Sequence, residues 1–397
     1  MNEWFYLIRE IVGWLVLTAA ALPSAYLGLL ALGALLPYRR GKKGEPAKKI
    51  AVVIPAHNET ILIEGTVTKA LQQEYPKEAY CIYVIADNCS DDTAEKAERA
   101  GARVLVRSDN PGKGQGLNAA FTNLLQEDWD AFLVIDADTE MHPQALARIS
   151  DALHDGAAAT QLFYGVLNPK DTMRTVAMEF ALSSFNGLRP RGKAPFRISS
   201  GIFGNGFCLS RQVLTEVPYL AHSIVEDLEY HLRLLDAGFR VRFIDDAWVK
   251  AQMPITAKQA ESQRVRWERG RMQMIKAHAG RLLGKAFRGN LTAFEAFIDV
   301  VMPPVSAIAM LLIIAFVIGP MSVRFAALGC LSLLVIHYGL GSLKYGSISG
   351  LIRIAFYLPW YIVWKTWIVV SSLVKQRTLG WVRTKRHDEN NEVEESS

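Results

Sequence analysis

Residues 50–59 read IAVVIPAHNE, an apolar run that is released into a polar loop. An uninterrupted apolar run of this length predicts a strand that is buried on both faces. Four more short apolar runs follow, and a stretch of helical period separates each from the next. This alternation predicts an α/β domain with a mostly parallel sheet and right-handed crossovers, in which ligands bind beyond the carboxyl ends of the strands.

Five strands and the helices between and after them are predicted. Strands are expected at Ile50–Pro55, Tyr80–Ala86, Arg103–Arg107, Ala131–Ile135 and Ala158–Phe163. Helices are expected between them at Glu59–Gln73, Asp92–Ala100, Gly116–Gln126 and Pro143–Leu153. A further amphipathic helix is expected near Glu226 through Leu235, ending at Gly238, and another from about Ala257.

The composition indicates a protein that is partly soluble and partly embedded in a membrane. Of the 397 residues, 50% are hydrophobic and only 21% are charged. The 44 Lys and Arg against 39 Asp and Glu give a net charge of +5, and no basic stripe interleaved with aromatics occurs, so nucleic acid is excluded as a partner. The four cysteines form no CxxC or Cys/His ligand set and are interpreted as reduced cytosolic residues.

The apolar run from Ile11 to Leu36 is long enough to cross a bilayer, and a cluster of Arg and Lys follows at residues 39–43. The basic cluster predicts that the following domain lies in the cytoplasm. A signal peptide is the alternative, because Ala19–Ala21 resembles a cleavage site, but the apolar run continues past it and favours an anchor.

Three apolar stretches follow near the C-terminus, at Phe297–Met321, Phe325–Leu343 and Leu351–Val374. The last contains Arg353, Pro359 and Lys365, so two full spans plus an interfacial or re-entrant segment are expected, with four spans in all as the alternative. The predicted organisation is an anchor at 1–37, a basic linker at 38–49, a cytoplasmic α/β domain at 50–290, membrane and interface helices at 291–375, and a basic then acidic tail at 376–397. An integral protein of the inner membrane is therefore expected.

Polar residues at the predicted strand ends are candidates for ligand binding. Asp87 follows the second strand directly and can accept a hydrogen bond from a nucleobase or ribose, whereas Asp91 and Asp92 are better explained as helix-capping residues. Residues 110–116 place three glycines around Lys113, so backbone amides and an ammonium group can approach an anion there. A solvated turn is the alternative for this segment.

Two acidic pairs are candidates for metal binding and proton transfer. Asp136 and Asp138 follow the fourth strand with their side chains on the same side, and such hard oxygen ligands suit Mg²⁺ or Mn²⁺ shared with a diphosphate. Glu226 and Asp227 stand near the start of a predicted helix, where one carboxylate can accept a proton and its neighbour can raise its pKa. A turn with a cap, and ordinary acids of a helix start, are the respective alternatives.

A third candidate group lies on the predicted helix after residue 257. Gln263, Arg266, Trp267 and Gly270 have the spacing i, i+3, i+4 and i+7 and share one face. A guanidinium there can neutralise a departing diphosphate, and an indole can stack on a sugar ring. A basic helix at the membrane surface is the alternative.

Taken in order, these motifs resemble those of the family 2 glycosyltransferases, and within them the membrane synthases related to cellulose, hyaluronan and poly-N-acetylglucosamine synthases. The resemblance covers roughly residues 50–271 and rests on VVIPAHNE, ADNCSDDT, NPGKGQGLN, DAD, GNGFCLSR, VED and QRVRW, the last matching the QxxRW pattern. It implies a Rossmann-like, nucleotide-sugar-binding fold of GT-A type, flanked by transmembrane and interface helices.

The resemblance also implies a role for each matching residue. Asp227 corresponds to the catalytic base with Glu226 beside it, and Asp138 is the stronger metal ligand of the DxD motif, before Asp136. The donor site would comprise Pro55, Glu59, Asp87, Lys113, Asp136, Asp138, Gln263 and Arg266, and the acceptor site Gly204, Asn205 and Trp267, with Mg²⁺ or Mn²⁺ as the cofactor.

The activity implied is that of an inverting, UDP-sugar-dependent hexosyltransferase. Asp227 would deprotonate an acceptor hydroxyl that attacks the anomeric carbon, and metal and Arg266 would stabilise the departing UDP. The expected acceptor is a growing saccharide in exopolysaccharide synthesis, and the expected partners are a UDP-sugar, membrane lipid, and a second copy or an accessory secretion subunit.

Two alternatives to this function stay open. One is a non-processive transferase acting on a ceramide, diacylglycerol or polyprenyl carrier, in which the basic segment 189–197 would meet headgroups or the acceptor. The other is a catalytically silent nucleotide-binding membrane module, which the intact Asp138, Asp227 and Arg266 disfavour.

Overall fold

The computed structural model describes residues 3–220, 223 and 225–374, with the side chains of 257–266 among those left undescribed. The chain divides into two compact units. One unit contains the N-terminal helix, residues 170–196 and the segment from residue 260 onward, and the other contains residues 37–169 and 197–259. Each unit is described by itself.

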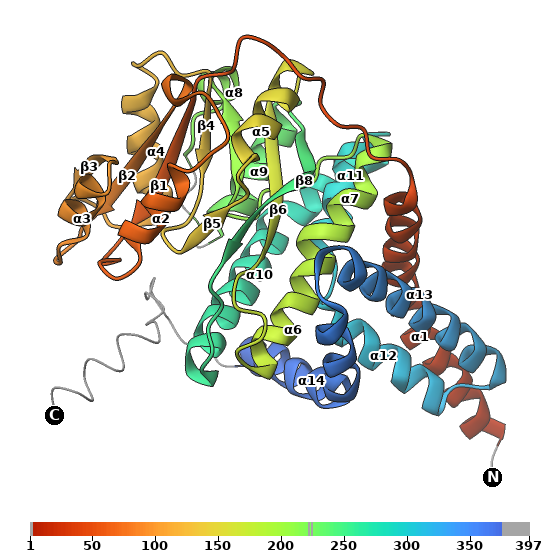
Figure 1. Cartoon of the computed structure of the whole chain (residues 1–397). Coiled ribbons are helices and arrows are strands. Elements are labelled where there is room, and N and C mark those ends of the chain that lie inside the picture. The colour runs from red at the N-terminus through yellow and green to blue at the C-terminus, as the bar shows by residue number, and fades with distance from the viewer. Residues whose placement is uncertain (1–2, 221–222, 224, 375–397) are drawn as a thin grey trace, which may run out of the picture. The chain divides into compact units, whose positions relative to one another are not determined.

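The second unit is built on an eight-stranded sheet, which confirms the α/β fold with a mostly parallel sheet. The strands lie in the order β3-β2-β1-β4-β7-β6-β8-β5 (Figure 1). Neighbours among β1 to β4 are parallel, as are β6 and β8, whereas β7 and β5 run antiparallel to their neighbours. The bounds are β1 Ile50–Ala56, β2 Tyr80–Asp87, β3 Arg103–Arg107, β4 Ala131–Val134, β5 Thr139–Met141, β6 Ala159–Val166, β7 Phe207–Ser210 and β8 Val241–Ala251.

Strand β1 explains why the sheet is covered on both faces. Ile50, Val52 and Ile54 are fully buried in one apolar cluster, and Ala51 and Val53 are fully buried in another on the opposite face. Because side chains alternate along a strand, the uninterrupted apolar run supplies both cores. Helices within residues 63–99 and 145–154 fill the first cluster, and helices within residues 113–124 and 211–236 fill the second, so the sheet is the middle of three layers (Figure 1).

The four helices predicted within residues 59–153 are each present: α2, α3 and α5 are shorter than the sequence predicts, whereas α4 is one residue longer and begins three residues earlier. Their bounds are α2 Ile63–Ala70, α3 Thr93–Arg99, α4 Lys113–Leu124, α5 Ala145–His154, α8 Arg211–Glu216 and α9 Glu226–Asp236, with a short 3-10 turn η1 at Lys77–Ala79. Strands β5, β7 and β8 were not predicted. The first two are short, and β8 carries two adjacent acids, Asp245 and Asp246, which obscure its strand pattern.

The register of the parallel strands determines where the polar strand ends gather. Ala56 at the end of β1 pairs with Ala86 of β2, and Val53 pairs with Val134 at the end of β4. Asp87 and Arg107, the last residues of β2 and β3, are themselves paired. Since these strands run in the same direction, their polar loops emerge at one edge of the sheet.

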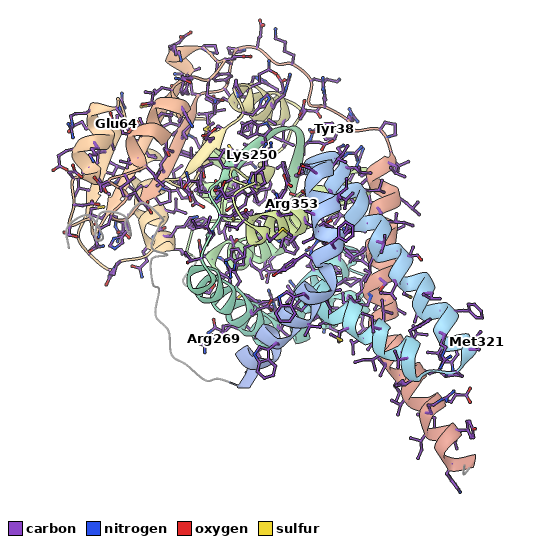
Figure 2. All side chains as sticks on the ribbon, turned by 60° about the horizontal axis from the view of Figure 1, so that its bottom comes forward. Tyr38, Glu64, Lys250, Arg269, Met321 and Arg353 are labelled. Carbon is purple, nitrogen blue, oxygen red and sulfur yellow. The ribbon has the colours of Figure 1, made fainter. Side chains whose placement is uncertain are left out.

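The first unit is helical. Its elements are α1 Glu3–Leu35, α6 Met173–Leu182, the π-helical turn η2 Ser183–Leu188, α7 Arg189–Lys193, the 3-10 turn η3 Ala194–Phe196, α10 Ala257–Phe287, which begins just before the unit does, α11 Leu291–Val301, α12 Val305–Ile318, α13 Met321–Tyr345 and α14 Ile348–Val374. Figure 2 labels Met321 at the start of α13 and Arg353 in α14.

Two helices among the described residues are long and apolar enough to cross a membrane: Tyr6–Leu35 within α1, and α13. Helices α11 and α12 pass the same test only as a pair and are bent by 78° at the break between them. The single span predicted at Phe297–Met321 is therefore divided. The reason is Pro303-Pro304, because proline lacks the backbone N–H and restricts the residue before it.

Residues 170–196 belong to the helical unit and not to the α/β domain predicted at 50–290. They form α6, η2, α7 and η3, and the basic side chains of α7 are buried: Lys193 is 2.5 Å from Glu295 and Arg189 is 2.9 Å from Asp299 on α11. The expectation that the basic segment 189–197 meets headgroups or acceptor is thus wrong for these two residues, because acids within the same unit already pair with them. The predicted tail at 376–397 lies outside the described residues.

Candidate active site

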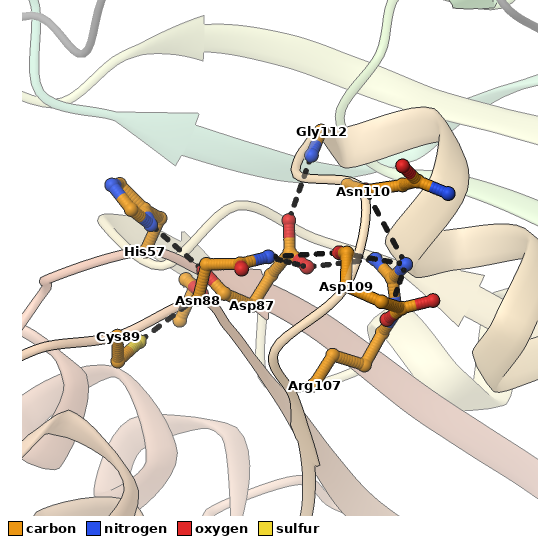
Figure 3. Close-up of polar contacts among 9 residues, drawn as sticks. His57, Asp87, Asn88, Cys89, Arg107, Asp109, Asn110 and Gly112 are labelled. Carbon is orange, nitrogen blue, oxygen red and sulfur yellow. Dashed lines mark hydrogen bonds and ion pairs between the residues drawn. The ribbon is translucent and has the colours of Figure 1, made fainter.

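Asp87 organises the loop that carries the three glycines. One of its carboxylate oxygens accepts hydrogen bonds from Arg107 Nη1 at 2.7 Å and from the Asn88 side chain at 3.1 Å. The other accepts the backbone N–H of Gly112 at 2.9 Å (Figure 3). Gly112 has φ +146, a value that side-chain-bearing residues rarely adopt. Asp87 therefore fixes the loop entering α4 in addition to lying where a nucleoside is expected.

The loop after β1 closes the same end of the sheet. His57 Nδ1 is 2.7 Å from the backbone oxygen of Asp87 (Figure 3). The Asn58 side chain accepts the backbone N–H of Ser90 at 2.8 Å, and the backbone N–H of Glu59 donates to Thr93 Oγ1 at 2.8 Å. The β1 and β2 loops, each predicted to contribute to the donor site, thus hold one another. Pro55 lies within β1, opposite Ile85.

Lys113, the first residue of α4, joins three elements of the site. Its ammonium group is 2.6 Å from Asp136 Oδ1 and 2.7 Å from the backbone oxygen of Gly204. Burial alone would lower the pKa of Lys113, but the charges of Asp136 and Glu226 outweigh it, so the pKa is raised. The lysine therefore stays charged beside the DxD turn.

Glu226 and Asp227 begin α9, and Asp227 lies beside Gly204. Asp227 Oδ1 accepts the backbone N–H of Leu228 at 2.8 Å. A Cβ atom on Gly204 would lie only 3.3 Å from Asp227 Oδ2, and Gly204 has φ +74, so glycine is required at this position. The structure thus brings together Lys113, Asp136, Gly204 and Asp227, which lie far apart in the sequence.

Burial raises the pKa values of both acids at the start of α9. The pKa of Glu226 rises from its ordinary 4.5 to about 7, first because of burial and then because of the charge of Asp227. Burial also raises the pKa of Asp227, against the hydrogen bond from Leu228. A carboxylate with a raised pKa is a stronger proton acceptor when it is ionised, as general-base catalysis requires.

Asn205 lies next to this cluster, but its side chain is fully buried. Its Oδ1 accepts the backbone N–H of Asp136 at 3.2 Å, and its Nδ2 donates to Thr139 Oγ1 at 2.8 Å. The amide thus faces the DxD turn, and the predicted contact of Asn205 with an acceptor stays a prediction.

The carboxylates of Asp136 and Asp138 fit a divalent metal ion in donor chemistry, since hard cations take carboxylate oxygens. The Lys113 ammonium group already forms an ion pair with Asp136. Among the described residues no group of three or more His, Cys, Asp or Glu is placed to hold a metal ion. The two aspartates would therefore need oxygens from another molecule, such as a diphosphate, to complete the coordination.

The QxxRW motif lies on α10. The side chains of Gln263 and Arg266 are outside the described residues, and Trp267 is 40% exposed. Their predicted roles toward diphosphate and acceptor stay predictions.

Two residues of the site are not among those that the sequence analysis predicts. Arg107 ends β3 and is nearly buried against Asp87, and a basic residue at the last position of a strand was a signal for it. Gln161 is completely buried in β6, and its signal was a polar side chain inside an apolar strand.

A mostly parallel sheet with a glycine-rich loop, a lysine and clustered carboxylates at its carboxyl edge is the arrangement of a GT-A-type glycosyltransferase. A family model described as "Glycosyltransferase like family 2" matches residues 46–270. The chain belongs to this family of glycosyltransferases, as the resemblance in its motifs indicates.

Individual relatives agree with the family. The chain is 27% identical over 273 residues to the probable glycosyltransferase YdaM of Bacillus subtilis, covering 64% of each protein. It is 26% identical over 262 residues to the UDP-forming cellulose synthase catalytic subunit of Pseudomonas fluorescens, covering 62% of this chain and 34% of that one. It is 30% identical over 113 residues to the dolichol-phosphate mannosyltransferase of Pyrococcus furiosus, covering 28% and 31%. The chain thus spans less than two thirds of the length of each relative.

Among solved structures, the mannosyltransferase PcManGT of Pyrobaculum calidifontis, in complex with GDP-Man and Mn²⁺, superposes with a TM-score of 0.56. The match covers 92% of this chain and 98% of that one at 17% identity. At this identity the likeness supports the fold alone.

The raised pKa of Glu226 makes stability depend on pH. Between about pH 4.5 and about pH 7 the folded state holds a proton that the unfolded chain has lost, so the free energy of unfolding falls as pH rises and then levels off. Glu226→Gln removes the buried charge. We expect it to raise the free energy of unfolding by roughly 3 kcal/mol near pH 8 and to leave it unchanged near pH 4.

Thermal unfolding of the purified protein without donor, at both pH values, measures this effect. Glu98→Gln, on the exposed side of α3, is the matched control and should change stability at neither pH. A Glu226→Gln protein that is less stable than the wild type near pH 8 would contradict the assignment of Glu226 as a buried carboxylate whose ionisation destabilises the folded state.

Proposed function

We propose that this glycosyltransferase is an inverting enzyme of the inner membrane that transfers a sugar from a UDP-sugar to a hydroxyl of a growing saccharide. The observation that carries the proposal is the cluster in which Lys113 bonds Asp136 and Gly204 while Asp227 lies against Gly204. It places a cation for a diphosphate and a base for a hydroxyl beside one glycine.

The donor occupies the carboxyl edge of the sheet in this proposal. Its nucleoside lies by Asp87, with Pro55 and Glu59 on the neighbouring β1 segment, and its diphosphate lies by Lys113 and the N-terminus of α4. Partial positive charge at a helix N-terminus favours an anion there. Asp136 and Asp138 hold Mg²⁺ or Mn²⁺ together with the diphosphate. When bound, the metal supplies Lewis-acid stabilisation of the charge on the leaving group.

The chemistry is a single displacement. Asp227 takes the proton of the acceptor hydroxyl, the hydroxyl oxygen forms a bond to the anomeric carbon, and the bond from that carbon to the phosphate oxygen breaks, releasing UDP. Attack from the face opposite UDP converts an α-linked donor into a β-linked product. Lys113, together with Gln263 and Arg266 of the QxxRW motif, stabilises the leaving diphosphate. Trp267 and Gly204 line the acceptor side, and Asn205 lies next to Gly204 with its side chain buried.

A lipid acceptor is the second candidate. The similarity to a dolichol-phosphate mannosyltransferase favours it, whereas the longer matched region in a cellulose synthase subunit favours a saccharide. Both candidate acceptors are compatible with an acceptor or product inside the bilayer, because α1 and α13 are long and apolar enough to span a membrane. The basic cluster at residues 39–43 supports a cytoplasmic catalytic domain. A second copy or an accessory secretion subunit is the partner that a saccharide product would need.

Asp227→Asn tests the assignment of the base. The substitution keeps the size of the side chain but removes its ability to take a proton, so transfer should fall at least about 100-fold. Binding of UDP, measured by calorimetry, should change by less than about threefold because the base does not contact the nucleotide. Asp128→Asn, whose carboxylate is 92% exposed in the same unit, is the control and should transfer normally. Normal transfer by Asp227→Asn would contradict the mechanism.

Lys113→Met tests whether Lys113 and a metal ion compete for Asp136. Without donor, the loss of the ammonium at 2.6 Å should strengthen Mn²⁺ binding by about tenfold, whereas UDP binding should weaken. Electron paramagnetic resonance of free Mn²⁺ measures the first effect and calorimetry the second.

The matched control for this pair is Lys49→Met, which removes a lysine paired with the exposed Asp128 and should alter neither affinity. Weaker Mn²⁺ binding by Lys113→Met in the absence of donor would show that the lysine and the metal ion do not compete for Asp136.

A further inference from the structure

A four-residue turn, 203–206, contacts the lysine, the base and the DxD turn of the candidate site. The backbone oxygen of Gly204 accepts the Lys113 ammonium, and its Cα faces Asp227. The Asn205 side chain reaches the DxD turn. The backbone N–H of Gly206 bonds the oxygen of Val134, the last residue of β4. The position of this turn thus sets how far the base, the lysine and the DxD turn stand from one another.

Gln161, on β6, holds the turn from behind. Its Oε1 accepts the backbone N–H of Phe203 at 3.1 Å. Its Nε2 donates to the backbone oxygen of Asn205 at 2.8 Å and to that of Leu162 at 2.9 Å. The side chain is 0% exposed and uses both of its N–H donors. A buried amide with both ends engaged has one orientation, so the turn it bonds is fixed as well.

Asn205 passes this constraint on to the DxD turn. Its Oδ1 accepts the backbone N–H of Asp136, and its Nδ2 donates to Thr139 Oγ1, so it holds the turn on both sides of Asp138. Asn205 is also 0% exposed, and Thr139 is 1% exposed. No solvent competes for these bonds, and the two amides form a continuous buried path from β6 to the aspartates.

We propose that Gln161 and Asn205 are positioning residues for sugar transfer, acting as one unit that places Asp136 and Asp138 relative to Lys113 and Asp227. Neither amide touches the reacting atoms. This inference rests on the proposed function, because it needs a diphosphate and a metal ion at the DxD turn. It explains why a strand buried on both faces carries a glutamine, and why Asn205, next to the acceptor side, turns its amide inward.

Three substitutions test the proposal. Gln161→Met keeps the length of the side chain and removes its three hydrogen bonds. Asn205→Ser leaves the backbone oxygen that Gln161 bonds but withdraws the amide from Asp136. Thr160→Val is the matched control, because Thr160 lies next to Gln161 on β6, is also 0% exposed, and has a hydroxyl without a hydrogen-bond partner among the described residues.

The expected signature is specific to positioning. For Gln161→Met and Asn205→Ser, kcat should fall by about 100-fold, as a displacement of about 1 Å at the reacting groups can produce. The affinity for UDP without metal should change by less than about threefold, because Asp87 and the glycine-rich loop stay in place. The increase in UDP affinity caused by Mn²⁺ should fall by about tenfold. The double variant should be no worse than either single one, since both break the same path.

The outcomes separate the inference from the proposed function. If the wild type and Thr160→Val transfer sugar while Gln161→Met and Asn205→Ser do so at the same rate, the inference is wrong and the function stands. If UDP binding by Gln161→Met and Asn205→Ser is weakened equally with and without Mn²⁺, and their melting temperatures are lower, both residues contribute only to the stability of the core and the inference is wrong. If Gln161→Met does not fold, Asn205→Ser decides by the same measurements. If the wild type itself transfers no sugar, the proposed function fails first.

Discussion

The bond between the Lys113 ammonium and the Asp136 carboxylate, 2.6 Å long, is the interaction on which the candidate site depends. It connects the start of α4 with the end of β4, and the same ammonium reaches the backbone of Gly204 beside the acids of α9. Asp136, Asp138, Glu226 and Asp227 bring four carboxylates to this region, and burial raises the pKa values of the last two. A site with this excess of acid favours ligands that bring cations, such as a nucleotide diphosphate bound with a divalent metal ion.

The sheet makes this arrangement available because its first four strands are parallel. Their carboxyl ends carry Asp87, Arg107 and Asp136 to one edge, and the antiparallel β7 returns along β4 so that its preceding turn meets them there. Gly204 and Gly206, at φ +74 and +73, let that turn pass close to Asp227 and to Val249. Lys113 and Asp136, which follow strands of the parallel half of the sheet, and Asp227, at the start of α9, thus meet at a single glycine.

The sequence predicted the parallel half of the sheet well because its strands are uninterrupted apolar runs that end in polar loops, as at residues 50–59. It also placed Lys113, Asp136 and Asp227 among the candidates. It could not predict that Gln161 and Asn205 link these residues, since hydrogen bonds between segments distant in sequence leave no local pattern. Hydropathy stays high across Pro303-Pro304, so hydropathy alone does not predict the bend between α11 and α12. The burial of Lys193 could not be predicted either, because its partners Glu295 and Asp299 lie about a hundred residues away in the sequence.

The most direct measurement is the fate of the sugar. Purified protein in lipid nanodiscs is given radiolabelled UDP-sugars with Mn²⁺ or Mg²⁺, UDP release is followed, and the labelled product is sized and partitioned into organic solvent. We expect UDP release with the label in a β-linked, water-soluble saccharide of high molecular weight. Label confined to a short product soluble in organic solvent would contradict the saccharide acceptor in favour of a lipid, and no transfer from any UDP-sugar would contradict the proposed donor.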